Sequence, residues 1–274
     1  DASRTAGRTH TITGKVKILQ GELRTGYISG SSHNGTGLNW GETHIYNGGK
    51  LECDQTNSTD DSNMEVDSTF DSMLVDSGGT LSLSPTTTFI ESEASSHAFR
   101  ISGGGTLENN DGTLEIKTAG STRLTMNGTG DVHNLTVNHG SCNLFLEGDT
   151  STTIEGNLII TQGTVTPTTE GGANRNLIVT GDVEIENGGQ LTGGSSSITM
   201  GSLATGLAGA GGTYSATSGT TTITKYRSNG KAIYGNGPII HNSGTFAFTN
   251  TDDYGSIQIQ LEGGAGSAGT QFND

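Results

Sequence analysis

Residues 78–84 read Gly78-Gly79-Thr80-Leu81-Ser82-Leu83-Ser84, a pair of glycines followed by a run in which leucine alternates with a hydroxyl residue. This alternation is typical of a β-strand with one buried face, and paired glycines are typical of a tight turn. The opening phrase Gly-Gly-x-Leu also occurs at 48–51, 104–107 and 188–191, with a degenerate copy, Ser-Gly-Thr-Phe, at 243–246. The phrase therefore predicts a turn and strand unit that recurs along the chain.

The spacing of these copies predicts a repeat of about 27 residues. Successive copies begin 30, 26, 84 and 55 residues apart, and the last two intervals divide into three and two repeats of similar length. Such a length accommodates one coil of three short strands and three corners. Stacked coils would pair their backbones in parallel, and their inward Leu, Ile and Val side chains would form aliphatic ladders.

Composition supports a thin core that is renewed many times. The chain has 274 residues, of which 45 are Gly, 29% are hydrophobic and only 15% are charged. A typical globular domain has about 25% charged residues and a larger apolar fraction. Short alternating runs persist along the chain, which argues against disorder, and helix-forming stretches are nearly absent. The segment 89–101 is expected to form two strands, 88–91 and 97–101, in preference to a short helix.

We therefore predict an all-β fold, a right-handed parallel β-helix of short, glycine-punctuated strands. Residues 1–262 are expected to form a single solenoid domain with an acidic loop-out near residues 54–72. Residues 263–274, rich in Gly and small side chains, are expected to form a flexible tail or linker. The small-residue segment 202–213 is expected to form a set of tight turns. The absence of an initiating Met and of a signal peptide suggests a processed product or a piece of a longer protein.

The acidic segment offers a candidate calcium site. Alternate residues would share one face if the segment were extended, and oxygen ligands are those that Ca²⁺ prefers. The side chains in question are Asp61, Asn63, Glu65 and Asp67. The segment lacks the glycine and terminal glutamate of an EF-hand loop, so a solvated acidic loop is the competing interpretation. Ca²⁺ is the one cofactor that the sequence suggests.

Other patterns give weaker indications of chemistry. The carboxylate pairs Glu91/Glu93 and Glu184/Glu186 would each share a strand face at a separation of about 6–7 Å, but such pairs arise easily among 28 acidic residues. Thr-x-Thr phrases at 11–13, 166–168 and 220–222 suggest an ice-binding threonine array, yet their spacing is too irregular to predict one. The cysteines Cys53 and Cys142 are either buried thiols or a pair formed between nearby coils.

The stretch 131–202 carries a family resemblance. Its phrases DVHNLTVNHG, GNLIITQGTVTP, NLIVTGDVEIENGGQLTGG and SSSITMGSL resemble the degenerate β-helical repeats of large phage structural proteins and of bacterial haemagglutinin-like surface proteins. The resemblance implies a surface-exposed scaffold, and no catalytic motif of those families is matched.

The sequence thus predicts a non-catalytic structural or adhesive module of a virion, as a fibre, decoration or tail-associated protein, or of a cell surface. Tailspike-like polysaccharide depolymerase and self-assembling extracellular filament subunit are the alternatives. The predicted partners are copies of itself, other virion or surface proteins, or a host glycan. A net charge of −15 argues against nucleic acid, and no apolar run is long enough for membrane insertion. The predicted location is extracellular, on a virion or on a cell.

Overall fold

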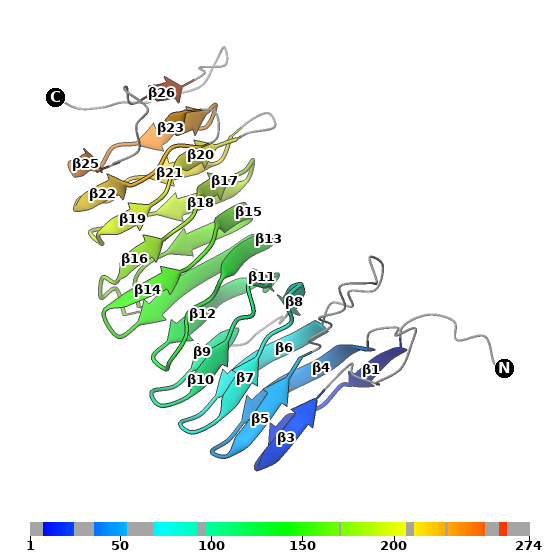
Figure 1. Ribbon diagram of the computed structural model, residues 1–274. Helices are drawn as coiled ribbons and strands as arrows, with labels where there is room; N and C mark the ends of the chain where they lie inside the picture. Colours follow the sequence, from blue (N-terminus) through cyan, green and yellow to red (C-terminus); the bar gives the residue numbers. More distant parts are fainter. Residues whose placement is uncertain are drawn as a thin grey trace.

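The computed structural model describes residues 8–24, 36–53, 68–91, 97–169, 171–206, 211–227, 230–249 and 258–261. In these residues all regular structure is β-strand, and every strand pairs in parallel with the strands of neighbouring turns. The strands belong to a sheet of seventeen, a sheet of four and a sheet of five, here called sheets A, B and C. Figure 1 shows the turns stacked along the chain. The predicted all-β parallel β-helix is confirmed.

Each turn passes three faces. The first face is formed by strands of sheet A, of which β4, β6, β13 and β15 continue onto the second face: β1 (Arg8–Ile12), β4 (Thr36–Ile45), β6 (Ser68–Val75), β8 (Thr87–Ile90), β11 (Thr113–Ile116), β13 (Asn134–Gly148), β15 (Leu158–Thr166), β17 (Val183–Ile185), β20 (Leu203–Thr205), β23 (Lys231–Gly235) and β26 (Gln258–Leu261). The second face adds further strands of sheet A: β2 (Val16–Ile18), β9 (Phe99–Ile101), β12 (Gly120–Met126), β18 (Gly189–Thr192), β21 (Thr213–Ser215) and β24 (Ile239–Ile240).

The third face consists of sheets B and C. Sheet B contains β3 (Gly21–Arg24), β5 (Gly49–Glu52), β7 (Thr80–Ser82) and β10 (Thr106–Glu108). Sheet C contains β14 (Ser151–Ile154), β16 (Asn176–Val179), β19 (Ile198–Met200), β22 (Thr220–Ile223) and β25 (Thr245–Phe248). Isolated parallel bridges join Thr106 to Thr129 and Val132 to Ile154, so sheet C continues the face that sheet B begins.

Inward side chains form the predicted aliphatic ladders. On the first face the register stacks six fully buried residues in successive turns: Leu114, Leu135, Leu158, Val183, Leu203 and Ile233. In sheet B the leucines of three Gly-Gly-x-Leu phrases, Leu51, Leu81 and Leu107, stack in the same way. Each turn buries only a few apolar groups against its neighbours, which is why a chain with so few large apolar residues can fold.

Glycine corners stack as the aliphatic residues do. Gly48, Gly78 and Gly104 have φ near +80°, a conformation that glycine adopts without steric cost. The Gly48 N–H donates to the Gly78 carbonyl at 2.9 Å, and the Gly78 N–H donates to the Gly104 carbonyl at 2.8 Å. In the degenerate copy Ser243 takes the same left-handed conformation, with φ of 59°. The corner geometry is thus retained where the glycine is lost.

Turn length varies more than one 27-residue repeat allows. The register offset is 30 residues from Trp40 to Phe70 but only 20 from Phe70 to Ile90. The division of the 84-residue interval into three equal repeats was therefore wrong. The phrase at 188–191 lies at the corner between the first and second faces, and its Leu191 pairs with Val165 and Tyr214 of sheet A.

The segment 89–101 forms two strands, β8 and β9, as predicted, with its strand ends displaced by one or two residues. The expectation of turns throughout 202–213 was wrong at its start. Residues Leu203–Thr205 form β20, which pairs with β17 and β23 and buries Leu203 in the aliphatic ladder. Its brevity and small neighbours concealed this strand in the sequence.

Candidate functional site

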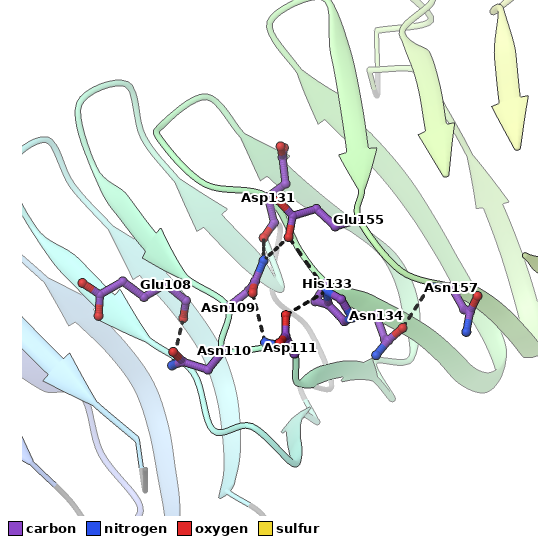
Figure 2. Close-up of polar contacts among 9 residues, drawn as sticks. All are labelled: Glu108, Asn109, Asn110, Asp111, Asp131, His133, Asn134, Glu155 and Asn157. Carbon is purple, nitrogen blue, oxygen red and sulfur yellow. Dashed lines mark hydrogen bonds and ion pairs between the residues drawn. The ribbon is translucent and has the colours of Figure 1, made fainter. Parts of the chain in front are cut away.

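A group of polar side chains gathers at the corner where the third face passes to the first (Figure 2). We call it the Asn109 corner; its members are Asn109, Asp111, Asp131, His133 and Glu155. They come from successive turns, because Asn109 and Asp111 follow β10, Asp131 and His133 precede β13, and Glu155 follows β14. The solenoid therefore brings together acidic, amide and imidazole groups that lie up to 46 residues apart in sequence.

The backbone around Asn109 is held in a left-handed turn. Asn110 and Asp111 have φ of 50° and 58°, which Asn and Asp tolerate better than other residues with a side chain. The Asn109 side-chain oxygen accepts a hydrogen bond from the Asp111 N–H at 3.1 Å, and the Asn110 amide donates to the Leu83 carbonyl at 2.7 Å. The turn is thereby attached to the turn that precedes it.

The charges of the corner are linked through Asn109 and His133. The Asn109 amide donates to Glu155 Oε2 at 2.7 Å and to the Asp131 carbonyl at 2.8 Å. His133 Nδ1 lies 3.4 Å from Asp111 Oδ1 and 3.8 Å from Glu155 Oε2. Burial raises the pKa of the Asp131 carboxyl, and the nearby Glu155 carboxylate raises it further. The corner is thus a place where acidic groups from separate turns meet under mutual repulsion.

Next to this corner, polar residues at the start of the first-face strands form a ladder. The Asn157 N–H donates to Asn134 Oδ1 at 2.9 Å, and the Asp182 N–H donates to Asn157 Oδ1 at 2.8 Å. Ser202 Oγ then donates to Asp182 Oδ1 at 2.7 Å. Each side chain therefore occupies a backbone or hydroxyl donor of the following turn, at the position directly before the first buried residue of its strand. The ladder is a stacking device.

The chemistry open to the Asn109 corner is limited by its exposure. The Asp111 and Glu155 side chains are 87% and 49% exposed, so water reaches both carboxylates. Among the described residues no group of three or more His, Cys, Asp or Glu side chains is placed to hold a metal ion. What the contacts do provide is attachment between successive turns. We therefore interpret the corner as a structural junction.

The four side chains of the predicted calcium site, Asp61, Asn63, Glu65 and Asp67, lie outside the described residues, as does Glu93. Of the other carboxylate pair, Glu184 contacts Arg227 Nη2 at 3.2 Å. The sequence gave some signal for the Asn109 corner, because 108–111 is a small acidic group and His133 precedes a strand. Nothing in the sequence placed these residues beside Glu155.

The two cysteines do not form a disulfide. Cys53 and Cys142 are both buried, on different faces, and burial raises the pKa of the Cys142 thiol to about 11. Of the two interpretations left open by the sequence, the structure supports buried thiols.

No family model, no curated protein and no solved structure matches this chain. In the part of the chain that the structure describes, no helix has the length and apolarity needed to cross a membrane. The resemblance to phage and haemagglutinin-like repeats remains a prediction.

Proposed function

We propose that the chain is a non-catalytic structural or adhesive β-solenoid module displayed on a virion or a cell surface. The observation that supports this most is the use of outward-facing charges to join turns. Lys50 lies within 4 Å of carboxylate oxygens of Glu22, Glu52 and Glu108, which span four successive strands of sheet B. These groups neutralise one another along the rod.

The same pattern recurs on sheet A. Lys117 Nζ lies 3.2 Å from Glu91 Oε1 and 3.8 Å from Glu115 Oε1, and Arg227 contacts both Asp182 and Glu184. Single exposed ion pairs contribute little to stability, but pairs repeated between turns oppose slippage of one turn past the next. Together with the buried ladders they favour a stiff spacer. The proposed partners are further copies of the chain, other surface proteins or a host glycan.

Surface display is tested with antibodies raised against the purified chain. We expect them to label intact particles or cells of the source without permeabilisation. Labelling that appears only after lysis would contradict the proposed location. Small-angle scattering of the purified chain provides the matching test of shape, and a rod is expected.

The non-catalytic role is tested on a broad panel of capsular and cell-wall glycans. We expect no release of reducing ends above a heat-denatured control. Dose-dependent cleavage that is lost on unfolding would instead assign a depolymerase activity, and variants of Glu184 and Glu186 would then be the first to test.

A further inference from the structure

The outward side of sheet C carries two regular columns of small side chains. The register aligns Ser151 with Asn176 and Thr220 with Thr245, and Ser197 lies between them directly before β19. The second column, two residues further along each strand, contains Thr153, Ile178, Thr199, Thr222 and Ala247. The residues between the columns point inward and are buried or half-buried, which fixes the outward direction of both columns.

Each column has a constant chemistry. Every member of the first column presents a hydroxyl or an amide, and every member of the second presents at least one methyl group. The five strands contain no Asp, Glu, Lys or Arg. The third face thus changes along the rod, because sheet B carries the Lys50 ion-pair cluster whereas sheet C is neutral.

The hydroxyl groups of this face have no partner within the described part of the chain. No hydrogen bond is formed by the side chains of Ser151, Thr153, Thr199, Thr220, Thr222 or Thr245, although neighbouring inward or corner residues such as Thr217 and Thr224 do form them. Since a hydroxyl both donates and accepts, these groups are available to a ligand that also does both. Thr is stiff at χ1, so the array is held in place before anything binds.

The backbone sets a two-dimensional repeat for these groups. Adjacent strands lie about 4.8 Å apart, and outward residues of one strand are separated by about 6.7 Å. Five strands therefore give an array about 20 Å long and two columns wide. A ligand that matches it must itself be neutral and periodic in two directions.

We propose that the outward side of sheet C binds the surface of ice. In ice every water molecule both donates and accepts hydrogen bonds at fixed positions, so a rigid row of hydroxyls can occupy lattice positions without adding charge. The methyl column favours ordered water around it, because first-shell water at apolar groups has restricted orientation. A charged group would impose a hydration shell that the lattice does not contain. This proposal does not rest on surface display.

Two other occupants fit the face less well. A second copy of the chain would need about 800 Å² on each partner, whereas an array of about 20 Å by 13 Å covers on the order of 250 Å². A glycan chain would be expected to stack on aromatic rings, and the two columns contain none. Periodicity without charge or aromatic platforms favours an ordered solid.

The test is partition of the purified chain between liquid water and slowly growing ice. Two variants are matched: Thr222→Lys in the second column of sheet C, and Thr213→Lys on the outward side of β21, in the same turn but on the second face. We expect the native chain and Thr213→Lys to be enriched in the ice and to inhibit ice recrystallisation. Thr222→Lys is expected to lose both properties while keeping its circular dichroism spectrum.

The proposal is overturned if the native chain is excluded from ice as completely as an unrelated soluble protein of equal size. It is also overturned if both variants lose the effect equally, since the sheet C face would then not be responsible. The third arm is sedimentation with crystalline cellulose and chitin. Binding there that Thr222→Lys abolishes, without partition into ice, would assign the face to a polysaccharide surface and refute ice binding.

Discussion

The inward aliphatic ladder can be tested at one pair of adjacent residues in β15. Leu158 is fully buried between Leu135 and Val183, whereas Ile159 points outward and is only half-buried. Leu158→Ala removes three carbon atoms from the core, a transfer loss of about 2.4 kcal/mol at about 0.8 kcal/mol per methylene. Incomplete collapse of the cavity raises the expected cost in unfolding free energy to about 3–4 kcal/mol. Ile159→Ala should cost about 1 kcal/mol or less, because water already reaches that side chain.

Urea unfolding followed by circular dichroism measures the difference. With an m-value of about 3 kcal/mol/M, Leu158→Ala lowers the midpoint by about 1 M, and Ile159→Ala by about 0.3 M or less. Solenoids unfold partly by nearest-neighbour steps, so hydrogen exchange should show the loss of protection centred on β13, β15 and β17. Equal midpoint shifts for the two variants would refute the assignment of Leu158 to the inside and of Ile159 to the outside.

Four further predictions concern the corners and the buried groups. Asn157→Ala leaves a backbone N–H of the next turn without its acceptor and should cost about 1 kcal/mol in thermal unfolding, while Asn157→Asp, which keeps an acceptor, should cost less. Gly112→Ala would place a Cβ 2.1 Å from the Ser84 carbonyl oxygen, so we expect a larger loss than for Asn157→Ala, and an unchanged melting temperature would contradict this. The pKa of Asp131 is raised in the folded state, so the folded chain holds more protons than the unfolded chain just above the model value of 3.8, and this group makes stability fall as pH rises through that window; Asp131→Asn should flatten that part of a stability profile. The Cys142 thiol, with its pKa raised to about 11, should react with a thiol reagent only after denaturation, and rapid labelling of the native chain would show that the site is open.

The parts of the fold that sequence predicts are those written in a short local pattern. Alternation of Leu with Ser or Thr after paired glycines placed β7 and β10, and their leucines stack as the repeat implies. The same reasoning found two strands in 89–101. In each case the signal lies within about eight residues, and strand alternation needs no more than that.

The parts that sequence misses depend on the offset between turns. Of the three Thr-x-Thr phrases, only 220–222 lies on sheet C; the phrase at 11–13 lies at β1 and the phrase at 166–168 at the end of β15. The other members of the array come from Ser-x-Thr and Asn-x-Ile, which have no visible relation to one another in the sequence. They align because the offsets of 25, 21, 23 and 25 residues happen to bring outward positions together. The same variation joined Asn109 to Glu155, which no spacing rule would pair.

Variable turn length also raises the question of what fixes the register, since a slip by one residue would exchange the inward and outward faces. In sheet B and on much of sheet A, ion pairs between turns answer it. Sheet C has no charges on its strands, so its register must be fixed from inside and at its corners. Tyr214, buried on the second face, packs edge-to-face on Phe246, and its hydroxyl lies 2.6 Å from Thr221 Oγ1 of sheet C. This internal polar and aromatic contact leaves the outward side of sheet C without any stabilising role, and its regular hydroxyl columns are therefore better explained by a ligand than by the fold.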